Sequence, residues 1–253
     1  MERGSEALVI LPTYLERETL PAVVSGIRQH VPDADILIID DNSSDGTGDI
    51  ADAIASDDPH VRVIHRPGKQ GLGTAYLLGF RHSLSHGYRF AVEMDSDGSH
   101  LARELPQLLT AAKSGAGLAL GARWVPGGRI ENWPWYRQWI SRMGTAVARL
   151  ALRSQLRDLT SGFRVVQTEW LERLDLESLT TQGYGFQVEL AWELERIGCP
   201  IVEVPITFVE RAGGHSKMSV GIAAEALVNV LRWGWQLRFG QRASTQHKNE
   251  PKP

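Results

Sequence analysis

Short apolar runs alternate with amphipathic stretches over the first half of this chain. Four runs have the length and composition of buried strands, at Ala7–Leu11, Ile36–Ile39, Val61–His65 and Phe90–Met94. Between them, apolar residues recur at helical spacing over about Arg17–His30, Gly46–Ser56 and Gly73–Ser85. This alternation predicts parallel strands joined by crossover helices, and therefore an α/β fold with a mostly parallel sheet flanked by helices.

The second half continues the pattern and adds a concentration of tryptophan. We expect strands at Leu118–Ala122 and Ile201–Val209, and helices at about Tyr136–Arg153, within Thr181–Arg196, and at Val220–Arg238. The first and last of these helices carry apolar and tryptophan residues on one side and polar or arginine residues on another. This composition is typical of interfacial amphipathic helices at a membrane, although helices that cover the core or form a dimer face share it.

Composition narrows the class of protein. The chain has 253 residues and a formal net charge of −3, which gives no general signal for a nucleic-acid partner. Cys199 is its single cysteine, so we expect a reducing compartment. The apolar runs are too short for a spanning helix, and residues 1–6 lack the apolar core of a signal peptide. We expect one domain over residues 1–240 and a disordered tail over 241–253.

The segment after Phe90–Met94 carries the clearest candidate chemistry. Asp95 and Asp97 stand one residue apart at the end of a buried strand, where ionised carboxylates require a charge partner. Mg²⁺ or Mn²⁺ bridging to a diphosphate is such a partner, because these ions take one or two protein carboxylates together with phosphate oxygens. The same residues are also common in ordinary turns.

Other strands end in similar polar segments. Pro12 and Tyr14 follow the first strand, and Asp40 and Asp41 follow the second. Ligands of open α/β sheets bind beyond the carboxyl ends of the strands, so we expect these segments to form one site with Asp95 and Asp97. The first strand is not followed by Gly-x-Gly-x-x-Gly, and no P-loop motif occurs, which disfavours a dinucleotide dehydrogenase and a P-loop enzyme.

Together these segments resemble the dolichol-phosphate (polyprenol-phosphate) mannosyltransferases, within the inverting family-two glycosyltransferases of GT-A fold. Two positions depart from the usual pattern: Leu15 precedes Glu16, and Gly98 follows Asp97. The matching blocks are Leu11–Tyr14, Asp40–Thr47, Gly71–Tyr76, Met94–His100, Asp158–Arg164, Gly183–Glu189, Glu203–Phe208 and Gly214–Lys217.

The resemblance implies a division of labour, with residues 7–122 binding nucleotide sugar and metal and residues 123–240 facing acceptor and membrane. It implies Asp95 and Asp97 as metal ligands and Asp97, Arg123 and Lys217 as the catalytic set. The residues implied for nucleotide-sugar binding are Pro12, Tyr14, Glu16, Asp41, Gly71, Asp95, Asp97, Arg211 and Lys217. Those implied for the acceptor phosphate are Arg123, Ser141 and Arg142.

The implied reaction moves mannose from GDP-mannose to a polyprenyl phosphate with inversion, using Mg²⁺ or Mn²⁺. A phosphate monoester is already an anion near neutral pH, so it requires positioning and charge compensation more than a strong general base. We expect a peripheral enzyme on the cytoplasmic face of a membrane, with a possible membrane-anchoring partner protein and no nucleic acid. The alternatives are a UDP-glucose donor, a polysaccharide or protein acceptor, and a non-catalytic nucleotide-binding membrane module. The role of Glu189 stays open between catalytic and structural.

Overall fold

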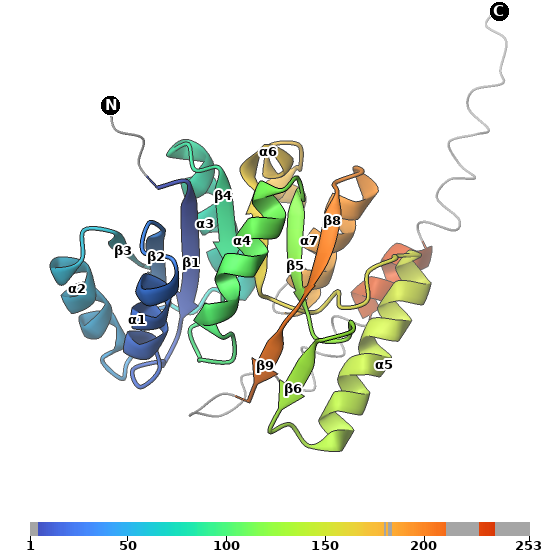
Figure 1. Cartoon of the computed structure of the whole chain (residues 1–253), viewed down its shortest axis with the longest axis horizontal. Helices are drawn as coiled ribbons and strands as arrows, with labels where there is room; N and C mark the ends of the chain where they lie inside the picture. The colour runs from blue at the N-terminus through green and yellow to red at the C-terminus, as the bar shows by residue number, and fades with distance from the viewer. Residues whose placement is uncertain (1–4, 180, 182–183, 211–227, 236–253) are drawn as a thin grey trace, which may run out of the picture.

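The computed structural model describes residues 5–179, 181, 184–210 and 228–235. A seven-stranded sheet runs through its centre in the order β3-β2-β1-β4-β7-β5-β8, and β6 and β9 form a separate two-stranded sheet (Figure 1). The strands are β1 Ala7–Thr13, β2 Asp35–Asp40, β3 Val61–His65, β4 Phe90–Glu93, β5 Leu118–Ala122, β6 Arg129–Glu131, β7 Arg164–Gln167, β8 Ile201–Pro205 and β9 Thr207–Val209.

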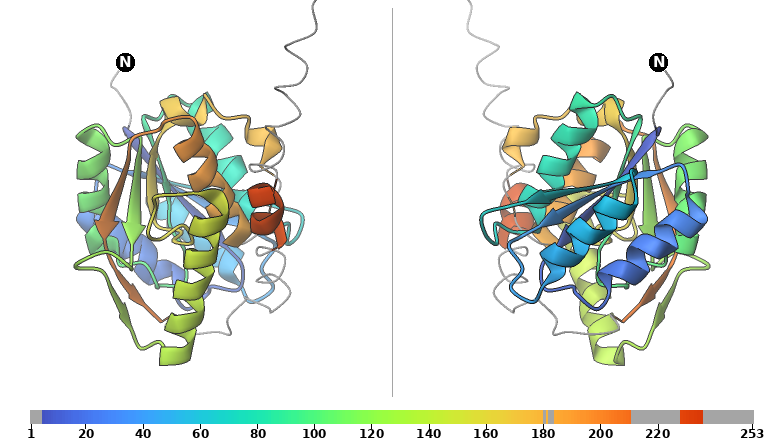
Figure 2. Two further views of the ribbon diagram at one scale, coloured as in Figure 1. Left: turned by 90° about the vertical axis from the view of Figure 1, so that its right-hand side faces the viewer. Right: turned by 90° about the vertical axis from the view of Figure 1, so that its left-hand side faces the viewer.

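Helices cover both faces of the large sheet (Figure 2). Alternate residues of β1 point to opposite faces, so Leu8 and Ile10 pack with α3 and α7, whereas Val9 and Leu11 pack with α1 and α4. Residues 228–235 form a further helical segment that packs on the α7 side. The helices are α1 Leu20–His30, α2 Thr47–Asp57, α3 Leu72–Ser85, η1 Ala102–Glu104, α4 Leu105–Lys113, α5 Trp135–Leu152, α6 Thr168–Leu171, η2 Leu176–Ser178 and α7 Tyr184–Arg196.

The predicted parallel strands are confirmed, and there are two further strands, β6 and β7, that the sequence pattern did not indicate. The neighbouring pairs β1–β2, β2–β3, β1–β4 and β5–β8 are parallel. Strand β7 lies between β4 and β5 and is antiparallel to both, with Glu93 opposite Arg164. The second half of the chain therefore supplies a central strand to the sheet that carries the first half.

Two predicted elements need correction. The strand expected over Ile201–Val209 is two strands, because the chain leaves the large sheet at Pro205 and pairs with β6 from Thr207 onward. The helix expected from about Arg17 begins at Leu20, after a turn in which Glu16 accepts backbone N–H groups from Thr19 and Leu20. Of the predicted helix Val220–Arg238, only residues 228–235 are described, and the predicted tail 241–253 lies outside the described residues.

No helix within the described residues is both long and apolar enough to cross a membrane.

Candidate functional site

The polar segments after β1, β2 and β4 meet at the carboxyl edge of the sheet, as the sequence predicted. Thr13 lies opposite Asp40 in the parallel register, and the backbone N–H of Asp41 donates to the carbonyl of Thr13 at 3.0 Å. Ser96 Oγ donates to the carbonyl of Pro12 at 2.8 Å. These bonds hold the loop that carries the aspartates against the end of β1, so the three segments form one continuous site.

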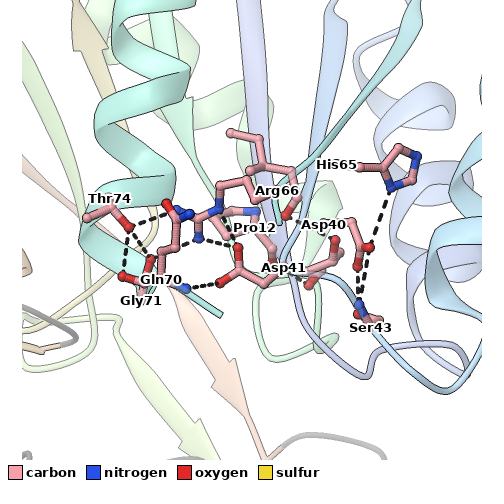
Figure 3. A network of polar contacts seen from close by, with 12 residues as sticks. Pro12, Asp40, Asp41, Ser43, His65, Arg66, Gln70, Gly71 and Thr74 are labelled. Carbon is pink, nitrogen blue, oxygen red and sulfur yellow. Dashed lines mark hydrogen bonds and ion pairs between the residues drawn. The ribbon is translucent and has the colours of Figure 1, made fainter. Parts of the chain in front are cut away.

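Asp41 is the centre of a polar network with a residue that sequence reasoning missed. The guanidinium of Arg66, which is 6% exposed, donates through Nε and forms a short ion pair with Asp41 (Figure 3). Arg66 also donates to Thr74 Oγ1 at 2.7 Å and to the carbonyl of Gly71 at 3.1 Å. The backbone N–H of Gln70 donates to the second Asp41 oxygen at 3.4 Å. Arg66 therefore holds the Asp41 carboxylate against the start of α3.

The same network fixes the glycine turn that precedes α3. Gly71 has a φ of +95°, a backbone conformation that residues with a Cβ rarely adopt, and its carbonyl accepts from Arg66. The ammonium of Lys69 lies 4.5 Å from the centre of the Tyr14 ring. Arg66 thus links Asp41 to Gly71, and Lys69, two residues before Gly71, links this turn to Tyr14.

Two other predicted positions serve local structure. Glu16 is 7% exposed, and its carboxylate accepts from Thr19 Oγ1 at 3.0 Å. Burial acts to raise the pKa of Asp45, but hydrogen bonds outweigh it and lower that pKa: the carboxylate accepts from the Thr47 hydroxyl at 2.5 Å, from the backbone N–H of Thr47 at 3.0 Å and from that of Arg17 at 3.3 Å. The contacts of Asp45 with Thr47 stabilise the start of α2.

The Asp95–Asp97 segment has the donors that a hard divalent cation prefers. Asp97 is 5% exposed and its Oδ1 accepts the backbone N–H of Ser99 at 2.9 Å, whereas the Asp95 side chain is 32% exposed and accepts from Tyr76 at 3.3 Å. Among the described residues, no group of three His, Cys, Asp or Glu side chains gathers around a point where a metal would sit. A cation here would therefore complete its coordination with oxygens of its ligand.

His100 is built into the same loop as a neutral side chain. The backbone N–H of Asp95 donates to His100 Nδ1 at 3.0 Å, so Nδ1 carries no proton. Burial lowers the pKa of His100 to about 4, an effect that the charge of Arg123 reinforces and the charge of Asp97 opposes. The ring stacks on Phe163 at 5.0 Å between ring centres. His100 thus shapes the loop as an uncharged spacer.

Beneath the aspartates lies a buried ion pair. Glu93 and Arg164 are both fully buried, with 3.6 Å between Glu93 Oε2 and Arg164 Nε. Arg164 also donates to the carbonyls of Ser161, Leu159 and Gln187. Burial raises the pKa of Glu93 to about 7, and the charge of Arg164 only partly offsets that effect. The pair ties β7 to β4 directly before the Asp95–Asp97 segment.

Glu189, whose role the sequence left open, has clear partners. Its carboxylate accepts the backbone N–H of Thr181 at 3.1 Å and the Thr181 hydroxyl at 2.5 Å. The carbonyl of Thr181 in turn approaches Gly73, where an added Cβ would lie 2.8 Å from it. Glu189 therefore holds the segment before α7 against α3.

Arg123 forms a buried ion pair with Asp158, which the sequence alone did not indicate. Its Nε and Nη2 donate to the two oxygens of Asp158, both at 2.8 Å, and Nη2 also donates to Thr160 Oγ1 at 2.8 Å. Arg123 is 4% exposed and Asp158 fully buried. The guanidinium is thus held in a fixed orientation by a bidentate contact, with its charge offset by Asp158.

A hollow of about 370 Å³ opens beside Arg123 and α5. It contains Arg123 and Arg142 of the predicted acceptor residues but not Ser141. Arg142 lies over the ring of Trp124, with 4.5 Å between its guanidinium carbon and the ring centre. The residues that line the hollow are Arg123, Trp124, Val125, Gly128, Arg142, Thr145, Ala146, Arg149 and Arg157. Arg149 and Arg157 belong to none of the matching motifs, which explains why motif reasoning missed them.

The predicted residues Arg211 and Lys217 lie outside the described residues. The last described residue before them, Glu210, accepts from Arg137 of α5 at 2.9 Å. The backbone N–H of Val209 donates to the carbonyl of Ser99 at 3.1 Å, and His100 forms an isolated bridge with Phe208. Strand β9 thus connects the aspartate loop to the start of the segment that carries both predicted cations.

The fold and this site are those of a glycosyltransferase of GT-A type, with a mostly parallel sheet that presents Asp95 and Asp97 at its carboxyl edge. The model of glycosyl transferase family 2 matches residues 8–175, and the chain belongs to that family. The chain is 50% identical over 237 residues to an undecaprenyl-phosphate mannosyltransferase of Micrococcus luteus, a match that covers 93% of this chain and 97% of that protein.

Two further comparisons agree. A polyprenol monophosphomannose synthase of Mycolicibacterium smegmatis is 48% identical over 228 residues, which cover 90% of this chain and 86% of that protein. Among solved structures, the mannosyltransferase PcManGT of Pyrobaculum calidifontis, in complex with GDP-Man and Mn²⁺, superposes with a TM-score of 0.58. That match has 15% identity and covers 100% of this chain and 67% of that one, so it supports the fold alone.

Proposed function

We propose that this chain transfers mannose from GDP-mannose to a polyprenyl phosphate with inversion, giving a polyprenyl-phosphate β-mannose and GDP. The observation that carries the proposal is the arrangement around His100: Asp97 belongs to the same loop, and the ring of Phe208 contacts both His100, at 5.5 Å between ring centres, and the guanidinium of Arg123, at 5.3 Å. The group suited to the donor diphosphate and the group suited to an acceptor phosphate therefore lie close to the same side chain. The near-50% identity to two mannosyltransferases of polyprenyl phosphates supports the same reaction.

The nucleotide would bind at the carboxyl edge of β1 and β2. Tyr14 and Pro12 flank the base, Asp41 accepts from base or ribose, and Gly71 allows the ligand to approach the backbone. Glu16, buried against Thr19, contributes by holding the turn after β1. Asp95 and Asp97 would hold Mg²⁺ or Mn²⁺, which offsets the diphosphate charge and stabilises the leaving nucleoside diphosphate.

The acceptor would approach from the α5 side. Arg123, Ser141 and Arg142 position its phosphate, whose oxygen attacks the anomeric carbon as the bond from that carbon to the GDP oxygen breaks. Arg123 is suited to this because Asp158 fixes the direction of its guanidinium before any ligand binds. Arg211 and Lys217 complete the proposal as cations that close over the diphosphate.

The exposed face of α5 suits a membrane surface. Its largely exposed apolar side chains include Trp135 at 79%, Trp139 at 60% and Ile140 at 58%. The neighbouring segment 228–235 exposes Val228 and Leu231 as well. An acceptor with a long prenyl chain is confined to a bilayer, so we propose peripheral docking of this face on the cytoplasmic side, with a membrane-anchoring partner protein as an additional attachment.

The test is an incubation of the purified chain with radiolabelled GDP-mannose, a short polyprenyl phosphate in detergent, and Mg²⁺ or Mn²⁺, followed by lipid extraction. Metal-dependent labelled lipid is the expected result. Label from UDP-glucose with none from GDP-mannose would reassign the donor. Binding of GDP without turnover on lipid, polysaccharide or protein acceptors would contradict the enzymatic proposal.

A further inference from the structure

The hollow beside α5 contains cationic side chains that the proposed reaction does not use. Arg149 and Arg157 line it together with Arg142, and the described part of the chain contains no ion pair for any of these three. Arg123, by contrast, is neutralised by Asp158. A second carboxylate, Glu203, accepts the backbone N–H groups of Arg157 and Asp158 at 2.7 and 2.9 Å and feels the charge of Arg157, so two carboxylates stand against the four arginines that line the hollow. The hollow therefore has an excess of positive charge that the described residues do not balance.

Several polar groups in the hollow also lack hydrogen-bond partners. Thr145 is 3% exposed, and within the described residues its hydroxyl makes no hydrogen bond. The same holds for Trp124 Nε1 and Arg149 Nε, and all three side chains line the hollow. Leaving buried donors unpaired costs free energy, and all three groups can donate to the same kind of ligand. Several donors among cations suit an anion with several acceptor oxygens, such as a phosphate.

The position of the hollow on α5 indicates where that phosphate comes from. Arg142, Thr145 and Arg149 recur at spacings of three and four, so they share one side of the helix. The adjacent side exposes Trp139, with Met143 at 44% and Leu150 at 75%. Where an apolar helix face enters a membrane, a basic stripe along its border lies at the level of the lipid headgroups.

We propose that Trp124, Thr145, Arg149 and Arg157 form a site for the phosphate headgroup of an anionic bilayer lipid, separate from the acceptor. Bound there, the lipid would fix the rotation of α5 about its axis as well as its depth in the membrane. The inference rests on one part of the proposed function, namely that the exposed face of α5 docks on a membrane. It does not depend on the identity of donor or acceptor.

The experiment is vesicle flotation of the full chain without donor, acceptor or metal. Binding to vesicles of phosphatidylcholine is compared with binding to vesicles that also contain phosphatidylglycerol. We expect the wild type to prefer the anionic vesicles and Arg149→Gln/Arg157→Gln to lose about tenfold or more of that preference. Thr145→Val keeps the charge and the shape and removes the hydroxyl, so it should lower the preference by about twofold or more.

The charge-matched control is Arg62→Gln/Arg89→Gln, which removes two exposed arginines on β3 and beside β4. It should keep the wild-type preference; an equal loss in this control would mean that diffuse surface charge attracts the membrane, and would overturn the proposal. The proposal would also be overturned if Arg149→Gln/Arg157→Gln and Thr145→Val both kept the wild-type preference for anionic vesicles.

Turnover with a short acceptor in detergent separates this inference from the proposed function. The Arg149→Gln/Arg157→Gln variant should keep the wild-type KM for the acceptor there. A raised KM with unchanged vesicle preference would assign the hollow to the acceptor and refute the lipid site. If the chain transfers no sugar at all, the flotation result still decides the lipid site.

Discussion

Arg123 and Asp158 form two parallel hydrogen bonds of 2.8 Å at a place where neither side chain is more than 2% exposed. Removing one partner of such a buried pair leaves an uncompensated charge, which typically costs about 3–5 kcal/mol. We therefore expect Arg123→Ala to lower the free energy of unfolding by that amount, as measured by urea denaturation. Arg142→Ala is the control, because this exposed arginine contacts only the face of Trp124, and its loss should cost about 1 kcal/mol or less. If Arg123→Ala and Arg142→Ala lowered the free energy of unfolding by the same amount, the buried pair would have no special role in stability.

Asp97 should be essential for metal-dependent donor binding. A metal ion supplies several kcal/mol of charge stabilisation to a departing diphosphate, so Asp97→Ala should lower turnover by on the order of a thousandfold or more. Calorimetric titration of GDP with and without Mn²⁺ measures the binding part of the effect. Asp49→Ala, which removes an exposed carboxylate of α2, should behave as the wild type. Metal-dependent binding that survives in Asp97→Ala would rule out the proposed ligand.

Asp41 should contribute to nucleotide binding through its place in the Arg66 network. Asp41→Asn keeps the size of the side chain but removes the charge that orients the Arg66 guanidinium and the Gln70 N–H. Hydrogen bonds to charged groups are worth about 1.5–3 kcal/mol, so the Kd for GDP should rise by roughly 10- to 100-fold. Asp45→Asn is the comparison, because the hydrogen bonds of Asp45 with other described residues join it to Arg17, before α1, and to Thr47, at the start of α2. An effect of Asp45→Asn as large as that of Asp41→Asn would contradict a specific role of Asp41.

The buried Glu93 should make stability depend on pH. Its pKa is raised to about 7 from 4.5, so the folded state binds this proton more tightly than the unfolded chain does. The free energy of unfolding should therefore fall as the pH rises from about 4.5 to about 7, and this contribution should level off above pH 7. Subtracting the stability curve of Glu93→Gln isolates the contribution, because His100, which acts in the opposite direction, is present in both proteins. A difference curve that is flat over this range would refute the raised pKa.

The sequence predicted the parallel strands and the site at their ends because each strand is a short apolar run and polar residues follow it directly. Asp95 and Asp97 follow a short apolar run, and the parallel topology brings them to Asp41 without further information. Arg66 left no such pattern: a single arginine after a strand resembles any surface residue until the fold buries it beside Asp41. Its partner is 25 residues away in the chain, so only the tertiary structure reveals the pair.

The errors in the predicted elements have similar causes. Strand β7 has four residues and follows a turn-rich motif, so no periodicity marked it. The run Ile201–Val209 is rich in apolar and β-branched residues, yet β8 ends at Pro205 because proline cannot donate to a strand neighbour. Arg149 and Arg157 are ordinary arginines in sequence, and the shape of the hollow depends on how α5 packs against the loop before β6.

The antiparallel strand β7 also has a consequence for synthesis on the ribosome. Strands β4 and β5 emerge first, but they have no contact as neighbours until residues 164–167 fill the space between them. Until then each presents an unpaired edge of the kind that recruits strands from other chains. A nascent chain that stops before β7 would be a target for chaperones, and the sheet closes only when most of the polypeptide has left the exit tunnel.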